Sequence, residues 1–543
     1  MSPSETPTRY PPGTSQLLLD SSHIVLIPTP TEDPNDPLNW SLLRKSINFL
    51  FVLALTIAIF TAITMQVVFW QQIIIDLDVT YDQLNAGVAA NSAGLAAGCV
   101  LFIPLTRKYG CRSTYILSTA VMASVSWWSS RMTTATEIYI TNFLFGLAGS
   151  LNETISEITI ADLFFTHQRG TANGLYIVAV VFGNFVCPTI AGVQAAALGW
   201  RWTYYTVGIC LTVLFLLFCI FFEETKYVPI YNTEPPDDAL RRPIEIDDDG
   251  AANPSTFPAK DVPPHSKQDF AHDIQGQDQP SLESQPPTAK KSYVERLRLI
   301  TNTDEPLWRN YITPFKMARF PHVLFTAVQV ANALAFIVLL TSTNSMVFSA
   351  APYNFDTSGV GLMLMGPFVG NILGSLYGGL LGDWVVVRLA KRNGGIFEPE
   401  MRLYILPFPA ICQGAGLALY GVAADRGWHW IYPSIGGAIF GFGAAAMMDV
   451  SCTIVIDIYQ NLTAEAFILI TFIRNVPAIG VPFGVVSWIE SAGLTKLYVI
   501  GGCVSSAVCL LCVPLIYWGR RIRKASWGPY ESILQQHGFV GGQ

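Results

Sequence analysis

Twelve stretches of about 20 mostly apolar residues run through this 543-residue chain. Six precede a long polar segment and six follow it: 47–70, 83–105, 113–131, 137–161, 171–193 and 201–222, then 321–343, 358–382, 401–423, 429–456, 465–488 and 496–518. A helix of this length and polarity spans the hydrocarbon core of a bilayer. Only 13% of residues are charged and the mean hydropathy is +0.39, which soluble domains do not reach. The sequence therefore predicts an all-α membrane protein with twelve transmembrane helices in two six-helix bundles.

The polar segments divide the chain into five expected parts. These are an N-terminal tail over 1–45, an N-terminal bundle over 46–222, a linker over 223–315, a C-terminal bundle over 316–519 and a C-terminal tail over 520–543. The linker contains "TEPPDDAL" and "QDQPSLESQPP". A segment so rich in proline, acid and amide buries too little apolar surface to fold alone, so we predict that it is disordered.

Lysine and arginine gather in the short loops on one side of the predicted membrane. They follow the second, eighth and twelfth spans: Arg107, Lys108 and Arg112; Arg388, Lys391, Arg392 and Arg402; Arg520, Arg521, Arg523 and Lys524. The alternate loops hold acids such as Asp76 and Asp78, or almost no charge. Because cytoplasmic loops carry the excess of basic residues, both termini and the linker are predicted to be cytoplasmic. The plasma membrane is the expected location, with the vacuole as the alternative.

The two halves carry related patterns. The fourth span reads "FGLAGSLNETISEITIAD" and the tenth reads "FGFGAAAMMDVSCTIVID", and each half has a basic loop after its second span. Two related six-helix bundles with a pathway between them are typical of a transporter. The net charge of −7 is concentrated in the polar tail and linker and gives no reason to expect nucleic acid.

Motifs for catalysis are missing from the chain. It has no Walker loop, no HExxH motif and no paired histidines, so we expect no enzyme activity, no ATP-driven transport, no cofactor and no metal. The expected partners are a small-molecule substrate, protons and the lipid bilayer, and the chain is expected to act as a monomer.

Two carboxylates, Glu153 and Glu157, lie one helical turn apart in the fourth span. If this helix starts near Ile138, a rise of 1.5 Å per residue places Glu153 about 22 Å deep, past the bilayer midplane. A charge facing lipid there costs about 2.5–3.5 kcal/mol, so both side chains should face the bundle interior or a wet cavity. A carboxyl in such a cavity can hold a proton or, when ionised, bind a cation. The alternatives are a structural pairing of Glu153 with another helix and a hydrogen bond of Glu157 near the interface.

Further polar residues lie at mid-depth in other spans. Asp449 occupies the tenth span and Arg474 the eleventh, where the arginine needs a partner such as Asp449 or Glu153. An ion pair that bridges helices and a contact with substrate both remain open for Arg474. Three amides, Gln329, Asn332 and Asn184, are candidates to line a substrate cavity, and interhelical hydrogen bonding is the alternative for each.

Several short motifs resemble those of the major facilitator superfamily over all twelve spans. The loop after the second span reads "PLTRKYGCRS", in which Lys108, Gly110 and Arg112 match the gating loop of that family, while Arg107 stands where the family has an acid. Its counterpart in the second half, "GGLLGDW", keeps Gly379 and Asp383. The resemblance implies the major facilitator fold, in which two bundles rock around a central site.

The fifth span and several flanking motifs narrow the resemblance to fungal members of the drug:proton antiporter branch. "GNFVCPTIAG" is similar to the antiporter motif of this branch, with Gly183, Pro188 and Gly192 at matching positions. In the fourth span Asn142 replaces the arginine of the drug transporters. The motifs "DPLNW", "IADLFFTHQRG", "GWRW" and "FIRN" resemble a fungal subgroup whose relatives move organic cations, including polyamines, and secondary metabolites.

These patterns favour a proton-coupled secondary transporter that exports organic cations, drugs or secondary metabolites. The first alternative is an importer of a polyamine-like cation or another small nutrient, because the same carboxylates serve either direction. The second alternative, of another class, is a transporter-like sensor. A sensor would need a long signalling extension, and the chain ends about 25 residues after the last predicted span.

Overall fold

The computed structural model describes residues 15–16, 33, 35–164, 166–226, 292–298, 307–393, 396–459 and 462–536. Within these ranges, some side chains lie outside the description: those of residues 15–16, 103, 107, 151–154, 157, 161, 166–171, 294, 307, 309–310, 464 and 535–536. Most of the predicted linker also lies outside the described residues.

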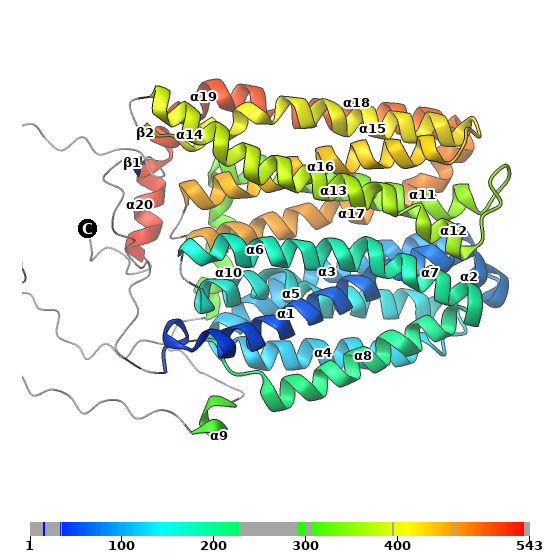
Figure 1. The fold of residues 1–543 in the computed structure, drawn as a ribbon, viewed down its shortest axis with the longest axis horizontal. Coiled ribbons are helices and arrows are strands. Elements are labelled where there is room, and N and C mark those ends of the chain that lie inside the picture. The colour runs from blue at the N-terminus through cyan, green and yellow to red at the C-terminus, as the bar shows by residue number, and fades with distance from the viewer. Residues whose placement is uncertain are drawn as a thin grey trace, which may run out of the picture.

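The first half is a bundle of long helices that run along one axis (Figure 1). It consists of α1 (Leu42–Thr64), η2 (Met65–Phe69), α2 (Trp70–Leu77), α3 (Tyr81–Tyr109), α4 (Cys111–Ser129), α5 (Ala135–Leu163), α6 (Thr166–Val181), η3 (Phe182–Val186), α7 (Cys187–Leu198) and α8 (Trp200–Phe221). The short 3₁₀ helix η1 (Pro37–Asn39) precedes α1. A π-helical segment, η3, joins α6 and α7 into one long helix.

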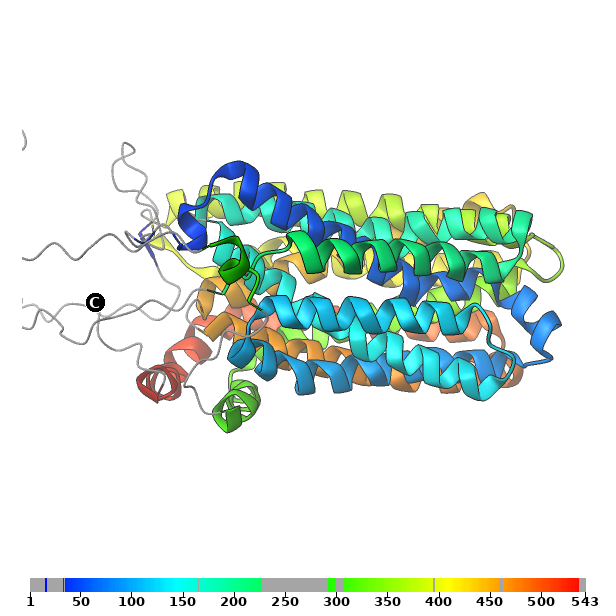
Figure 2. The same cartoon turned by 90° about the horizontal axis from the view of Figure 1, so that it is seen from below.

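The second half lies beside the first and has the same organisation (Figure 2). It consists of α11 (Pro321–Phe348), α12 (Thr357–Leu362), α13 (Met365–Leu376), η6 (Tyr377–Leu381), α14 (Gly382–Arg392), η7 (Pro399–Ile405), α15 (Pro407–Asp425), α16 (Ile431–Ile458), α17 (Thr463–Ala492), α18 (Leu494–Cys509) and α19 (Cys512–Ala525). The segment η6, like η3, is a π-helix.

The two ends of the bundles differ, and we name them by what lies there. The end that carries α9 (Tyr293–Arg296), α10 (Leu307–Lys316), η5 (Met317–Arg319) and α20 (Trp527–Gln536) is the linker end. A two-residue antiparallel pair, β1 (Ser15–Gln16) with β2 (Ile396–Phe397), also lies there. The opposite end, with α2 and the start of α12, is the distal end (Figure 1).

Length and hydropathy identify nine membrane-crossing helices among the described residues, or ten if η7 and α15, which meet at 41°, form one span. The other two predicted spans coincide with α4 and α5, which run alongside the rest. The described helices thus cover all twelve predicted spans.

Capping residues and glycines determine where several helices begin. Thr80 and Thr134 start α3 and α5 with capping boxes, in which side chain and backbone satisfy each other's hydrogen bonds. The chain reverses between α3 and α4 at Gly110, and between α7 and α8 at Gly199. Their φ values of +103° and +88° are ones that a side chain disfavours, so a residue other than glycine would be strained at either turn.

Close glycine contacts recur in corresponding places of the two halves. A Cβ on Gly94 of α3 would lie 2.2 Å from the carbonyl oxygen of Phe143 in α5. A Cβ on Gly370 of α13 would lie 1.9 Å from the carbonyl oxygen of Ala438 in α16. In both halves the second span therefore packs backbone to backbone against the fourth, as small residues in membrane helices allow. This packing agrees with the related sequence patterns of the two halves.

The predicted disordered linker requires a correction where it is described. Residues 293–296 form α9, and residues 307–316 form α10. The reason is tertiary contact: Tyr293 donates a hydrogen bond to the Ile220 carbonyl, and Tyr311 donates one of 3.2 Å to the Leu101 carbonyl. Docking on the bundles orders segments whose composition alone predicts disorder.

Candidate transport site and gates

The two carboxylates of the fourth span belong to α5, the central helix of the first half. Their side chains lie outside the described residues, so the predictions for Glu153 and Glu157 stay predictions. The helix itself packs on α3 through Gly146, whose added Cβ would lie 2.0 Å from the Asn91 carbonyl oxygen, and on α1 through Gly149. These contacts fix the axis of α5 against two helices of its own half.

Asp449 occupies the corresponding place on α16, where it faces α13 and the π-segment η6. The Ser375 hydroxyl of α13 lies close to its carboxyl. A Cβ on Gly378 would lie 3.2 Å from the Cβ of Asp449, so a glycine makes room for the acid. The side chain is partly buried. A carboxyl inside a membrane bundle beside a π-segment is typical of a functional position more than of a packed core.

Arg474 and Asn475 are neighbours on α17, in the "FIRN" motif. None of the described ion pairs joins Asp449 to Arg474, so this predicted pairing is not formed here. The side chain of Glu153, the other predicted partner of Arg474, lies outside the description. Asn475 is fully buried, and neither polar atom of its side chain has a hydrogen-bond partner among the described residues. Buried amides are rarely left without partners. Sequence reasoning missed Asn475, although its place beside an intramembrane arginine was a signal.

Two predicted cavity residues of α11 make contacts with α18 instead. Gln329 is 1% exposed and donates a 2.8 Å hydrogen bond to the Val508 carbonyl. Asn332 donates a 3.1 Å hydrogen bond to the Ser505 hydroxyl. The interhelical hydrogen bonds that the sequence left open as an alternative are therefore the contacts that these amides make. Residues three apart share one helix face, and in α11 this face meets α18.

Two further amides, Asn142 and Asn184, belong to the first half. Asn142, in place of the family's arginine, is buried and donates a 2.9 Å hydrogen bond to Gln66 Oε1. Asn184 lies in the π-segment η3, is partly exposed and has no hydrogen-bond partner among the described residues. Gln329 and Asn332 donate hydrogen bonds to α18, whereas Asn184 makes no hydrogen bond to another described residue.

A contact between the halves closes the distal end. Thr189 on α7 donates a 2.8 Å hydrogen bond to the Gly361 carbonyl on α12. A Cβ on Gly192 would lie 2.6 Å from the Thr357 carbonyl oxygen and 2.8 Å from Val68 Cγ1, so only glycine allows this approach. We call this contact, made by Val68, Thr189, Gly192, Thr357 and Gly361, the distal seal. The glycine motif of the fifth span therefore packs against the other half.

Pro188 and Gly183 belong to the same long helix as the seal residues Thr189 and Gly192. Pro188 is buried at the start of α7, directly after the π-segment, where its missing N–H costs least. A Cβ on Gly183 would lie 2.9 Å from the Ile57 carbonyl oxygen of α1. The fifth span is thus held close to α1 through Gly183 and close to the second half through Gly192.

The linker end of the first half is tied together by the predicted gating loop. Glu224, just beyond α8, accepts hydrogen bonds of 3.0 and 3.1 Å from the backbone amides of Cys111 and Arg112 at the start of α4. The buried Arg112 donates to the carbonyls of Phe222 and Cys219, at 2.8 and 2.7 Å, and to the Leu297 carbonyl beyond α9. We call the contact of Glu224 with the two amides the Glu224 dock.

Two further residues of this gating loop contribute backbone rather than side chain. A Cβ on Gly110 would lie 2.3 Å from Glu224 Oε2, so the glycine also makes room for the dock. The carbonyl of Lys108 accepts a 3.2 Å hydrogen bond from Lys226 Nζ. The side chain of Arg107 lies outside the described residues.

Every second residue of the segment "EPEMR" forms an ion pair at the linker end of the second half. Arg402 donates hydrogen bonds of 2.8 Å to Asp383 and 2.7 Å to Asp457, which joins α14 to α16. Glu400 accepts two hydrogen bonds from Arg523 of α19, at 3.0 and 2.8 Å. Glu398 pairs with Arg520 at 3.2 Å.

Asp383 and Gly379 are the predicted gating residues of the second half. Asp383 follows η6 in the first turn of α14 and uses its carboxylate for the contact with Arg402. Nothing lies within 4 Å of a Cβ built on Gly379, so close packing does not explain this glycine. It lies within the π-segment η6, next to the Gly378 that contacts Asp449.

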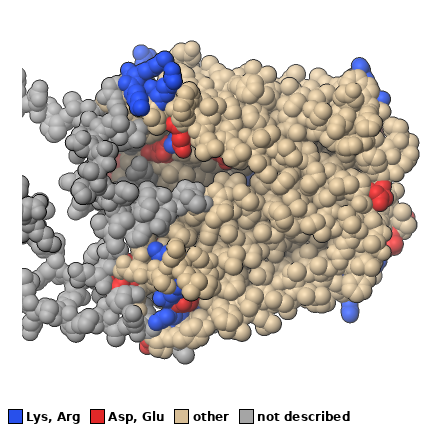
Figure 3. All heavy atoms as spheres, in the orientation of Figure 1, with Lys and Arg blue, Asp and Glu red and all other residues tan. Residues whose placement is uncertain are grey.

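The described surface is hollowed at the linker end, between α14 and α6 (Figure 3). Acidic side chains are visible inside the hollow. The described ion pairs at this end join helices of the same half, as Arg44 with Glu223 and Arg523 with Glu400 do. The halves thus meet at the distal end through the seal and also along α3 and α17, where Cys99 packs against Ile468, while the surface between α14 and α6 is recessed at the linker end.

Raising the pH is expected to weaken the Glu224 dock. Burial raises the pKa of Glu224 above its ordinary value of 4.5, and this effect exceeds the opposing effect of the amide hydrogen bonds. The docked state therefore favours the protonated carboxyl, and this stabilisation is present below the ordinary pKa and lost as the pH rises through the raised pKa. Because Glu224→Gln cannot titrate, the thermal stability of the variant relative to wild type should increase with pH. The same change at the exposed Glu490 is the control, and parallel pH profiles of Glu224→Gln and wild type would contradict the expectation.

Comparison with known proteins agrees with this architecture. Residues 50–482 match the family model described as Major Facilitator Superfamily. An uncharacterized MFS-type transporter of Schizosaccharomyces pombe is 30% identical, with 97% of this chain and 92% of that protein covered. Protein HOL1 of Saccharomyces cerevisiae is 25% identical over 94% of this chain and 92% of its own length. The efflux pump radE of Floropilus chiversii is 23% identical over 91% and 83%.

A solved structure shows the same fold. It is a bacterial homolog of the human lysosomal transporter Spinster in an inward-facing conformation, with a TM-score of 0.53 and 12% sequence identity. The alignment covers 90% of this chain and 99% of that one. The predicted all-α membrane fold is thereby confirmed, and so is the prediction that the chain is a transporter and not an enzyme. The chain belongs to the Major Facilitator Superfamily.

Proposed function

We propose that this protein is a proton-coupled secondary transporter that exports organic cations, drugs or secondary metabolites by alternating access. The observation that carries the proposal is the placement of acids on corresponding helices: Glu153 and Glu157 on α5, and Asp449 on α16. An acid inside a membrane bundle is costly unless it has a task, and binding protons or cations is the simplest one. The relative radE is an efflux pump, which supports the outward direction.

Each proposed site residue has a distinct role. Glu153 is the main proton-binding group and the one with which a cationic substrate competes, and Glu157 shares its helix face one turn away. Asp449, next to η6, provides the corresponding charge in the second half. Arg474 holds one of these acids in its ionised form in one conformation. Asn184 contributes an amide that polar groups of a substrate can reach.

The proposed orientation places the linker end in the cytoplasm and the distal end outside. The basic residues at the linker ends of α3, α14 and α19 support it. In this orientation the distal seal faces outward and the hollow between α14 and α6 opens to the cytoplasm, so the conformation described is inward-facing. A cytoplasmic substrate would enter through the hollow, and a rocking motion that breaks the seal would release it outside. The plasma membrane is the proposed location.

Import of a polyamine-like cation is the second candidate. The same carboxylates favour it, because a cation moving inward down the membrane potential gains about 2.3 kcal/mol per charge and 100 mV. Under this alternative the gates and the site keep their roles, and the direction of net flux is reversed.

The test is flux of labelled spermidine and of a lipophilic cation dye in yeast that expresses wild type or Glu153→Gln, with and without an uncoupler. We expect wild-type flux to depend on the proton gradient and the variant to lose that dependence, because the amide cannot bind a proton. The direction of flux distinguishes export from import. Equal, uncoupler-sensitive flux in both proteins would show that Glu153 has a structural role only.

A matched control lies on the same helix. Glu137 is the N3 residue of the capping box that starts α5, at the distal end and away from the proposed site. Because glutamine serves a capping box as glutamate does, Glu137→Gln should fold normally and keep its proton dependence. If both variants lost coupling equally, the effect would reflect damage to α5 and not proton binding at Glu153.

A further inference from the structure

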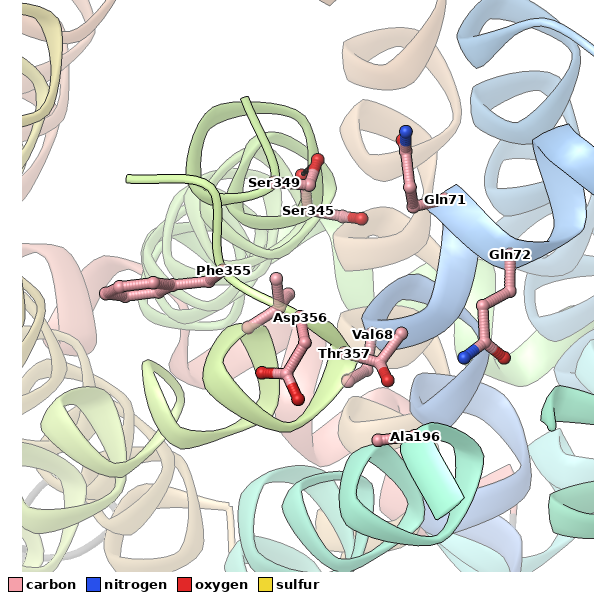
Figure 4. Close-up of a pocket in the computed structure, with 10 residues that line it drawn as sticks. Val68, Gln71, Gln72, Ala196, Ser345, Ser349, Phe355, Asp356 and Thr357 are labelled. Atoms are coloured by element: carbon pink, nitrogen blue, oxygen red, sulfur yellow. Dashed lines mark hydrogen bonds between the residues drawn. The ribbon is translucent and has the colours of Figure 1, made fainter. Parts of the chain in front are cut away.

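Cavities lie at both ends of the described bundles. One, of about 230 Å³, lies beside the distal seal, where Val68 and Thr357 line it (Figure 4). Asp356, which also lines it, already caps α12 by accepting a 2.9 Å hydrogen bond from the Gly359 amide. A larger cavity, of about 370 Å³, lies at the linker end between α10, η5 and α20. We call this second cavity the α10–α20 groove.

The lining of the α10–α20 groove combines hydrocarbon with positive charge. Its apolar wall comes from both helices, through Ile312, Phe315, Pro529 and Ile533. The charged residues among the described residues that line it are Lys316 and Arg319, and both are basic. Arg319 is exposed, and Lys316 is half-buried. A ligand that joins an anion to a hydrocarbon chain therefore matches both parts of the lining.

The outer face of α10 carries an apolar stripe that leads into the groove. Trp308, Ile312 and Phe315 follow one another at intervals of four and three residues, so they share one face of the helix. Their side chains are 74%, 37% and 48% exposed, whereas Thr313 and Pro314 on the opposite face are buried. Large apolar side chains gathered on one exposed face indicate contact with lipid or with another partner.

The position of the groove favours lipid as that partner. The segment η5 ends at Arg319 and the spanning helix α11 begins at Pro321, so the groove lies where a span leaves the hydrocarbon core. Both α10 and α20 run across the bundle axis, and Figure 2 shows them at the lower edge of the linker end, α20 in red and α10 in green. An amphipathic helix that lies in this way turns its apolar face toward acyl chains and its basic residues toward lipid phosphates.

The size and charge of the groove fit the polar part of a phospholipid. A volume of about 370 Å³ is at the lower end of the range for ligand pockets, so the groove holds a headgroup and the first carbons of the chains, while the rest stays in the bilayer. The guanidinium of Arg319 can donate two parallel hydrogen bonds to a phosphate, and Lys316 adds a second positive charge beside it.

We propose that the α10–α20 groove is a binding site for an anionic phospholipid, whose phosphate is held by Arg319 and Lys316 and whose acyl chains follow Ile312 and Phe315. The site also adjoins the junction of the halves. Tyr311 of α10 donates a 3.2 Å hydrogen bond to the Leu101 carbonyl of α3, and the Phe315 ring packs edge-on against Phe472 of α17, with centroids 6.0 Å apart. A lipid in the groove therefore holds α10 against both halves. The proposal goes beyond the proposed function, because it depends neither on the central acids nor on the direction of transport.

The test is amide hydrogen exchange of purified full-length protein in phosphatidylcholine nanodiscs that contain an increasing fraction of phosphatidylserine. We expect exchange in the segments 308–319 and 527–534 to slow as this fraction rises, because a bound lipid suppresses their local opening. In pure phosphatidylcholine, inorganic phosphate and glycerophosphoserine, which lack acyl chains, should have no such effect. Equal slowing by either soluble anion would show that the groove binds a free phosphate and would overturn the lipid assignment. The absence of slowing by phosphatidylserine would overturn it as well.

Three variants locate the effect. Arg319→Gln should raise the half-maximal fraction of phosphatidylserine about fivefold, since it removes one basic residue at an anionic lipid surface. Arg319→Lys should cause a smaller rise, because lysine keeps the charge but not the paired hydrogen bonds. Arg521→Gln removes an exposed basic residue of α19 at the same end and should leave the titration unchanged. An unchanged titration in Arg319→Gln, or an equal shift in Arg521→Gln, would overturn the assignment to the groove.

Discussion

Gly192→Leu is expected to open the distal seal and to lower transport about tenfold or more. A Cβ at this position would lie 2.6 Å from the carbonyl oxygen of Thr357 and 2.8 Å from Val68 Cγ1. The first of these atoms belongs to the backbone and cannot move aside cheaply, so the halves must separate. Overpacking of this kind costs about 1–3 kcal/mol, which shifts a two-state equilibrium by about fivefold to more than a hundredfold. Amide hydrogen exchange in α7 and α12 measures the opening, and substrate flux in yeast measures its effect on transport.

The control for this prediction is the same substitution on the same span. Nothing lies within 4 Å of a Cβ built on Gly174 of α6, so Gly174→Leu should leave both exchange and flux near wild type. Gly192→Ala should show a smaller effect in the same direction, because it adds one methyl group. If Gly192→Leu exchanges as slowly as wild type in α7 and α12, the close approach at Gly192 does not hold the halves together.

Arg523→Ala is expected to reduce the free energy of unfolding by about 3–5 kcal/mol, because it leaves a buried carboxylate without its partner. The side chain of Arg523 is fully buried, and that of Glu400 is 7% exposed. Two parallel hydrogen bonds, of 3.0 and 2.8 Å, join them. Thermal unfolding of the purified protein in one detergent, compared with wild type, measures the loss. Arg523→Lys should recover only part of it, since a lysine cannot form both hydrogen bonds.

Arg520 provides the control, because it lies three residues away on α19 and also pairs with a glutamate of the same segment. Its side chain is 59% exposed, and its contact with Glu398 is 3.2 Å long. Exposed ion pairs contribute about 0–1 kcal/mol, so Arg520→Ala should unfold near the wild-type temperature. The double variant Arg523→Met with Glu400→Leu should recover most of the stability, because it removes both charges. Equal losses in Arg520→Ala and Arg523→Ala would contradict the role of burial.

Sequence and structure agree wherever a residue acts through its own helix. The twelve apolar spans follow from hydropathy, and the close approach at Gly192 follows from glycine's lack of a side chain. The glycines of the fifth span permit close packing, but they do not identify the partner helix. That partner, α12, comes from the other half of the chain, and its Gly361 and Thr357 carry no pattern that points to α7.

Residues that act across helices were harder to predict. Gln329 and Asn332 share one face of α11, as their spacing indicates, yet the rotation of α11 turns that face toward α18. Glu224 and Arg402 are separated by 112 and 55 residues from the Arg112 amide and the Asp457 carboxylate that they contact. Contacts with distant residues also determine the structure of the linker. Its composition predicts disorder, whereas contacts with Ile220 and Leu101 order α9 and α10.

Local sequence is enough to predict that the chain spans a membrane many times in two related halves, because each span must satisfy the bilayer through its own length and hydropathy. It also determined which ionisable residues lie within spans, since their depth follows from the helical rise. Which of these residues meet, which end is sealed and where a cavity remains become visible in the folded bundle alone. Those features depend on the rotation and tilt of each helix, which are set by packing against neighbours that are distant in the sequence.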